Sequence, residues 1–191
     1  MSGANDSRTL KGVHHGAFRC RDAEQTRWFY QDVLGLETEG AVIIEEKNPA
    51  GVNERYMHIF FRMGNGEYIA FFDAPGSADP GWFEKKGGFD MHWAFEVDSE
   101  ADMLAMQKRI QGLGVTALGP VDHGFVRSVY MYDPNGIQVE ITVRTPTHDQ
   151  TFKDERAHLR GSLAEWTASS RAEKVAKFGA AALDRRGKPA R

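Results

Sequence analysis

Cysteine and long apolar segments are scarce in this sequence of 191 residues. Cys20 is the one cysteine, so an intrachain disulfide is excluded and a reducing compartment fits best. No apolar run approaches the roughly 20 residues that a membrane-spanning helix needs, and the opening MSGANDSRTL lacks the basic and apolar segments of a secretory signal. We therefore expect a cytoplasmic protein with no membrane partner, in which Cys20 is a small buried apolar side chain.

An excess of positive charge is also missing. The net charge is −3 at pH 7, which does not favour nucleic acid as a partner. The charge is unevenly distributed, because residues 1–143 contain 13 Lys and Arg against 21 Asp and Glu, whereas residues 144–191 contain 11 against 6. This change of sign predicts a second compositional unit. Its basic residues are scattered, so we expect no nucleic-acid binding there either.

The sequence does contain an internal repeat. The segment HGAF at residues 15–18 matches HWAF at residues 92–95, 77 positions later. Each match is followed by an acidic segment of helical character that ends at a glycine. Three apolar segments of strand length come next, separated by turn sequences such as GNG and DPNG. The repeat predicts a strand–helix–three-strand module written twice, and therefore an α+β fold.

The repeat also distinguishes two adjacent histidines, His14 and His15. Successive residues of a strand point to opposite faces, and the repeat aligns His15 rather than His14 with His92. The alternate faces carry Phe18 and Phe95, and such apolar faces are the ones that a helix would cover. We therefore expect His15 and His92 to lie on the open faces of their sheets.

Glu140 has a similar placement on the last predicted strand, IQVEITV, opposite an apolar face. Two imidazoles and a carboxylate can occupy three positions of a divalent metal and leave the others open for substrate or dioxygen. A lone histidine on a strand is often a hydrogen-bonded structural group, but two histidines at matching positions of a repeat favour metal. The sequence thus predicts that His15, His92 and Glu140 bind one metal and that His14 does not.

These segments resemble the vicinal oxygen chelate superfamily, which includes glyoxalase I, extradiol ring-cleaving dioxygenases, fosfomycin-resistance thiol transferases and bleomycin-binding proteins. The matching stretches are HHGAFRCRDAEQTRWFYQDVLGLE, HWAFEVDSEADM and SVYMYDPNGIQVEI. The resemblance implies paired βαβββ modules that form a half-open barrel around a metal. We expect this domain at residues 12–144, with modules at 12–75 and 89–144, after a disordered N-terminus (1–11) and before a basic helical C-terminal extension (145–191).

The resemblance points to the same three metal ligands. The family's first-strand histidine falls on His15, its second-module histidine on His92 and its last-strand glutamate on Glu140. Glyoxalase-like members use a fourth ligand, a glutamate on the last strand of the first module, and that position falls on Ala70. The resemblance therefore implies three protein ligands and Fe2+ as the cofactor, with Mn2+ or another divalent metal as the alternative.

A more specific resemblance, to the extradiol dioxygenases, lies in VDHGFVRSVYMYDPNGIQVE. The family's roles would make Tyr130 a hydrogen-bond donor to the substrate oxygen and His123 its supporting partner, and a packing role for Tyr130 is the alternative. The register of the last hairpin decides between them. A four-residue loop at DPNG pairs Tyr130 with Val139, whereas a five-residue connection or a bulge pairs it with Glu140 on the metal face.

The resemblance implies a dioxygenase that cleaves a small catechol-like aromatic diol with O2. Aromatic residues near the start of the second module suit such a flat substrate: Trp82, Phe83, Phe89 and Trp93. Two-domain extradiol enzymes place another active-site histidine before the second metal histidine, and no histidine lies between Phe72 and Met91 here. The alternatives are an isomerase, lyase or thiol transferase that uses the metal as a Lewis acid, and a non-enzymatic binder of an aromatic ligand.

The basic tail predicts two helices. Apolar residues form two stripes along it, the first with Leu159, Leu163 and Trp166 and the second with Val175, Phe178 and Leu183. We expect the tail to pack on the acidic modules or on a partner subunit, and we expect a homo-oligomer.

Overall fold

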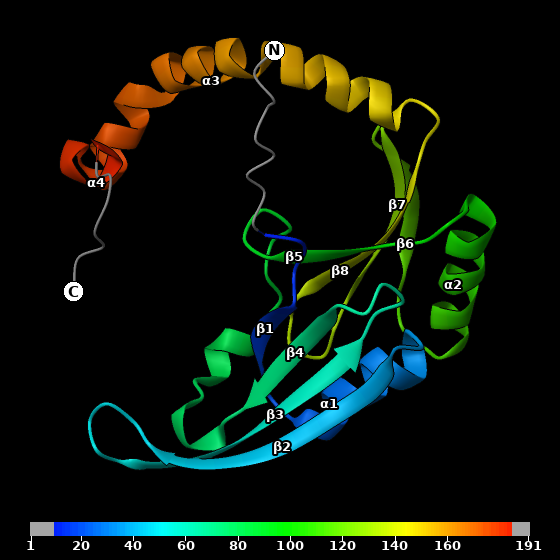
Figure 1. Cartoon of the computed structure of the whole chain (residues 1–191), viewed down its shortest axis with the longest axis vertical. Helices are drawn as coiled ribbons and strands as arrows, with labels where there is room; N and C mark the ends of the chain where they lie inside the picture. Colours follow the sequence, from blue (N-terminus) through cyan, green and yellow to red (C-terminus); the bar gives the residue numbers. More distant parts are fainter. Residues whose placement is uncertain (1–9, 185–191) are drawn as a thin grey trace, which may run out of the picture. The chain divides into compact units, whose positions relative to one another are not determined.

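The computed structural model describes residues 10–184, which Figure 1 shows in colour. Apart from Leu10 and Lys11, the N-terminal segment predicted to be disordered lies outside the described residues. The chain divides into two compact units, a first that ends at Arg144 and a second that begins at Thr145. None of the helices within residues 10–184 is long and apolar enough to cross a membrane.

The first unit contains two four-stranded sheets of the same topology (Figure 1). Their strands are β1 (His15–Cys20), β2 (Glu37–Lys47), β3 (Asn53–Arg62), β4 (Tyr68–Asp73), β5 (His92–Glu96), β6 (Leu118–Asp122), β7 (Val126–Tyr132) and β8 (Gln138–Arg144). The first sheet has the order β1-β4-β3-β2, with β1 parallel to β4 and the other pairs antiparallel. The second repeats this pattern as β5-β8-β7-β6. The two βαβββ modules that the sequence predicts are therefore confirmed.

A helix follows the first strand of each module. The helical elements of the first unit are α1 (Ala23–Arg27), its π-helical continuation η1 (Trp28–Val33), the single turns η2 (Pro75–Ser77) and η3 (Pro80–Phe83), and α2 (Glu100–Gly112). Asp22 and Ser99 cap α1 and α2, because each side chain accepts a hydrogen bond from the backbone N–H three residues later, at 2.6 and 3.1 Å. The π turn is a difference from the expected regular helix, and it buries Phe29, Tyr30 and Val33 together.

The inner faces of both sheets contribute to one apolar core. Phe18 and Trp93, from the first strands of the two modules, contact each other with ring centroids 5.6 Å apart. Full burial of side chains such as Phe71 and Val139 stabilises the fold by roughly 1.5–3 kcal/mol each. Cys20 is buried, as expected of a small apolar side chain, and this burial raises the pKa of its thiol to about 12.

A buried polar contact also joins the modules, at the DPNG turn between β7 and β8. Asp133 accepts hydrogen bonds from the backbone N–H groups of Asn135 and Ile137, at 2.9 and 2.8 Å. The buried side chain of Asn135 accepts from the Arg21 N–H (2.9 Å) and donates to the Thr26 hydroxyl (3.2 Å) in the first module. A buried amide without partners costs about 1–3 kcal/mol. These bonds therefore hold the turn, and with it the β7–β8 hairpin, against the start of α1.

The second unit is helical. It consists of α3 (His148–Phe178), a helix of 31 residues, and the short α4 (Ala180–Asp184). The two helices meet at Gly179, whose φ of 79° favours glycine. The sequence predicts two helices here, and the first is the longer because no Gly or Pro interrupts residues 162–178. Its stripe of Leu159, Leu163 and Trp166 is exposed, and the surface that it packs against stays a prediction.

Candidate metal and substrate site

His92 opens β5 on the open face of the second sheet. Its Nδ1 lies 2.8 Å from the Gly88 carbonyl oxygen. A carbonyl only accepts hydrogen bonds, so Nδ1 carries a proton, and in the neutral ring Nε2 is the nitrogen that has the lone pair. This Nε2 lies 3.7 Å from Oε2 of Glu140. The backbone of the preceding turn thus fixes both the tautomer and the direction of the ring.

Glu140 lies in the middle of β8, and only 8% of its surface is exposed. Its Oε1 accepts a hydrogen bond from the Ser128 hydroxyl at 2.5 Å, and that hydroxyl is 2.9 Å from the Thr142 hydroxyl. The other oxygen, Oε2, is the one that faces His92. A nearly buried carboxylate needs compensating partners, and the Ser128 hydroxyl supplies one to Oε1, which leaves Oε2 directed to His92.

The His92–Glu140 pair fits two ligands of a divalent cation. A separation of 3.7 Å between Nε2 and Oε2 is too long for a hydrogen bond, and the assigned tautomer has no proton on Nε2 to donate. Two ligands about 2.1 Å from one ion lie roughly 3–3.5 Å apart. A small movement of either side chain would therefore allow both lone pairs to bind a single ion.

His15 opens β1, and its ring lies near those of His58 and Phe60, with centroids 6.1 and 5.8 Å away. It therefore lies on the open face of the first sheet, as predicted. Within residues 10–184 of one chain, however, no three His, Cys, Asp or Glu side chains form a group able to hold a metal. The structure thus brings His92 and Glu140 together, and it does not bring His15 to them within one chain.

His14 departs from the alternation argument. The strand begins only at His15, so the strand geometry does not extend to its predecessor. The two Nδ1 atoms are 2.9 Å apart, and the His14 ring also lies 5.7 Å from that of Tyr68, which pairs with His15 across the sheet. The two histidines therefore contact each other instead of pointing to opposite faces, and the exclusive role of His15 stays a prediction.

Tyr130 lies on the same face as Glu140. The two residues pair directly in the β7–β8 ladder, and Tyr132 pairs with Gln138, which leaves a connection of five residues, 133–137. This is the register that the extradiol resemblance requires. The Tyr130 hydroxyl lies 2.7 Å from His123 Nε2. Burial is the largest cause of the raised pKa of the Tyr130 phenol, so the hydroxyl keeps its proton at neutral pH.

A cavity of about 630 Å³ covers this face and contains four of the five predicted site residues. Its lining consists of Gly88, Phe89, His92, Ala94, His123, Phe125, Val126, Tyr130, Gln138, Glu140 and Thr142. Of the four aromatic residues expected near a flat substrate, only Phe89 lines it, and Trp93 packs against the core. The sequence did not identify Phe125 as a lining residue, because its place in the cavity depends on the conformation of the turn between β6 and β7.

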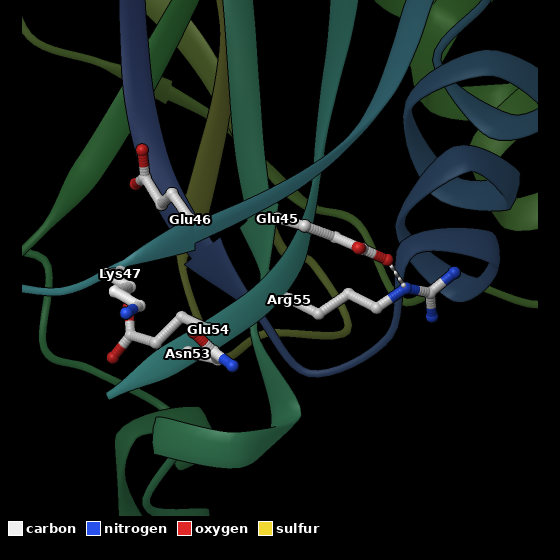
Figure 2. Close-up of a pocket in the computed structure, with 6 residues that line it drawn as sticks. All are labelled: Glu45, Glu46, Lys47, Asn53, Glu54 and Arg55. Carbon is white, nitrogen blue, oxygen red and sulfur yellow. Dashed lines mark hydrogen bonds and ion pairs between the residues drawn. The ribbon is translucent and has the colours of Figure 1, made fainter. Parts of the chain in front are cut away.

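A second cavity, of about 530 Å³, lies at the hairpin of β2 and β3 (Figure 2). Figure 2 shows charged side chains around it, with Glu45 accepting from the Arg55 guanidinium at 2.8 Å. Glu46 accepts from the Tyr56 hydroxyl (2.8 Å) and Glu54 from the Asn48 amide (2.9 Å). These exposed groups satisfy one another, so this hollow has the character of a solvated surface.

Known proteins share this fold. Residues 12–141 match the family described as the Glyoxalase/Bleomycin resistance protein/Dioxygenase superfamily. No curated protein matches the chain. A glyoxalase/dioxygenase from Nostoc punctiforme is similar in structure, with 24% sequence identity and a TM-score of 0.54, over 76% of this chain and 99% of that chain.

Two structures of a fosfomycin resistance protein are also similar. FosX from Listeria monocytogenes is 22% identical, with a TM-score of 0.53 over 73% of this chain and 98% of that one. A mutant of the same FosX, solved with Mn(II) and 1S,2S-dihydroxypropylphosphonic acid, is 22% identical with a TM-score of 0.51 over 74% and 98% of the two chains. At these identities the likeness shows the fold alone.

Proposed function

The chain belongs to the Glyoxalase/Bleomycin resistance protein/Dioxygenase superfamily, and we propose that it is an extradiol-type dioxygenase that cleaves a catechol-like diol with O2. The superfamily contains enzymes of several kinds, so the reaction type has to rest on the site. The observation that carries the proposal is the hydrogen-bonded pair of Tyr130 and His123 beside Glu140 on the open face.

The proposed metal ligands are His92 and Glu140 from one copy of the chain and His15 from a second copy. The second copy is invoked because, among residues 10–184 of one chain, His92 and Glu140 come together without His15. Fe2+ is the proposed ion, with Mn2+ as the alternative, which a similar FosX structure contains. Such an ion, held by three protein ligands, would have further coordination positions available to a diol and to O2.

The chain's own residues orient the substrate. In the proposed arrangement the Nε2–H of His123 donates to the Tyr130 oxygen, which leaves the phenol proton for the substrate's hydroxyl oxygen. Glu140 is held at Oε1 by the Ser128 hydroxyl, which leaves Oε2 directed to His92. His92 is kept from rotating by the Gly88 carbonyl. Tyr130 thus acts as a hydrogen-bond donor and His123 as the residue that positions it.

A Lewis-acid enzyme is the second candidate. It would use the same ligands to polarise substrate oxygens for isomerisation, elimination or thiol addition, without O2. The observation that favours it is the absence of any histidine between Phe72 and Met91, where a proton-transferring histidine would be expected of a ring-cleaving enzyme. In that case Tyr130 would donate to the oxygen that becomes negative during the reaction.

Oxygen uptake separates the two candidates. The protein is loaded with Fe2+ or Mn2+ under anaerobic conditions, its metal content is measured, and catechols of increasing size are supplied in an oxygen-electrode cell. We expect one metal per His92–Glu140 pair and O2 consumption that matches the loss of the aromatic diol. Stoichiometric metal with no O2 uptake on any catechol would leave the Lewis-acid candidate. Absence of metal at any pH near neutrality would contradict both.

A further inference from the structure

Phe89 is exposed to a degree that folding does not explain. Its relative exposed surface is 108%, the highest among the large apolar residues described as exposed. A phenylalanine contributes to stability through the apolar area that it removes from water, and Phe89 removes none. An isolated exposed apolar residue is common, so its exposure acquires meaning only from its position.

That position is the rim of the cavity above the proposed metal ligands. Phe89 lies in a tight turn in which Gly87 accepts hydrogen bonds from the N–H groups of Asp90 (2.9 Å) and Met91 (3.2 Å). The same turn presents the Gly88 carbonyl to Nδ1 of His92. This short segment therefore orients the proposed metal ligand His92 and also carries the unpacked ring of Phe89. The side chains of His92 and Phe89 line the same cavity.

The two phenylalanines that line the cavity lie next to opposite ends of the strand that carries Glu140. Phe89 precedes β5 at the end where His92 pairs with Gln138, whereas Phe125 precedes β7 at the end where Val126 pairs with Arg144. The two phenyl rings thus belong to opposite ends of β8, and Glu140 lies between these ends. A ligand over Glu140 would therefore meet polar groups beneath it and aromatic side chains towards the ends.

We propose that Phe89 is a specificity-determining residue that stacks on the face of a planar aromatic substrate at the mouth of the cavity. This inference rests on the proposed function for the identity of the site and adds the part of the substrate that the chain recognises. The polar edge of the substrate would be directed to His92, Glu140 and Tyr130, and its ring to Phe89. Stacked or edge-to-face aromatic pairs are favoured over aliphatic contacts of the same area.

The test compares a planar ligand with its saturated counterpart. 2-Naphthol and 2-decalol are titrated calorimetrically against the wild type and against Phe89→Ala, with and without added metal. Trp82→Ala is the matched control, because Trp82 is an exposed aromatic residue of the same inter-module segment that does not line this cavity. We expect Phe89→Ala to weaken 2-naphthol binding roughly 2- to 10-fold, the range of one aromatic pair, and to change 2-decalol binding less. Trp82→Ala should change neither.

Equal losses for both ligands, or no loss for 2-naphthol, would overturn the role of Phe89. Phe89→Trp is a second test variant, because a larger aromatic ring at the same position should retain or improve 2-naphthol binding. The titration needs neither turnover nor bound metal, so a failure of the dioxygenase proposal leaves it interpretable. If O2 uptake is found, Phe89→Ala should raise the KM for catechols with kcat and metal content nearly unchanged.

Discussion

The two modules have the same topology and similar inner faces, but their open faces differ in chemistry. In the first sheet Ala17 pairs with Ala70, and at the equivalent place in the second sheet Ala94 pairs with Glu140. The first open face is aromatic, with the His58 ring stacked on Phe72 at 3.8 Å. The second carries the carboxylate, the hydroxyls and the cavity. One module therefore carries the proposed ligand His15 beside aromatic rings, and the other carries the proposed ligands His92 and Glu140 beside Tyr130.

The largest expected effect comes from mixing two inactive variants. His15→Ala and Glu140→Ala should each lose metal and activity, because each removes one of three ligands. If the two open faces meet between copies, a mixed pair contains one site with all three ligands. Refolding the variants together should then restore about a quarter of the wild-type activity, since half of the pairs are mixed and each has one intact site of two.

No recovery on mixing would show that the ligands belong to one chain or that the assignment is wrong. His14→Ala is the control for the histidine assignment. His14 contacts His15 but is not a proposed ligand, so the metal content of the His14→Ala protein should stay near stoichiometric. Loss of metal in His14→Ala with retention in His15→Ala would reverse the assignment.

Tyr130→Phe should have the next largest effect, confined to the second face. It keeps the ring and its packing and removes one donor, which typically costs on the order of 10²–10³ in turnover. Fold and metal content should be unchanged, as measured by circular dichroism and metal analysis. Tyr132→Phe is the matched control, because its hydroxyl donates to the Lys86 carbonyl at 3.0 Å outside the cavity lining. Similar rates for the two variants would assign Tyr130 to packing.

Truncation after Thr147 tests whether the helical unit holds two copies together. Burial of side chains such as Leu163 and Trp166 contributes roughly 1.5–3 kcal/mol each, so we expect fewer copies per particle by light scattering or a lower Tm. The double substitution Leu163→Ala and Trp166→Ala in the full chain should reproduce this result. Lys153→Ala, off the apolar stripe, should not. An unchanged number of copies per particle and an unchanged Tm in the truncated chain would show the unit to be dispensable for assembly.

The smallest effect concerns Cys20 on the inner face of the first module. Burial raises the pKa of its thiol from 9.0 to about 12, so its contribution to stability is complete below pH 9 and is lost as the pH rises through about 12. At pH 8 the folded protein should react with iodoacetamide far more slowly than the urea-unfolded chain. Equal rates would show that the inner face of β1 is open to solvent.

The sequence was sufficient for the fold because its repeat is long and its inner faces alternate regularly. The resemblance put the family's fourth-ligand position on Ala70, and the strand register pairs Ala70 with Ala17 as it pairs Glu140 with Ala94. The hairpin register of Tyr130 remained open, because loop length at DPNG depends on the hydrogen bonds that Asp133 makes. The contact between His14 and His15 could not be predicted, since it depends on the residue at which the strand begins. The separation of His15 from Glu140 could not be predicted either, because it depends on how the two sheets pack and no local sequence pattern reports that packing.

The Asn135 side-chain amide, which bonds to Arg21 and Thr26, links the effects of substitutions in the two modules. The hairpin bearing Tyr130 and Glu140 is hydrogen-bonded to the start of α1 in the other module, so the position of the site depends on contacts between the two modules. A substitution that breaks these hydrogen bonds is therefore expected to change the packing of both modules at once.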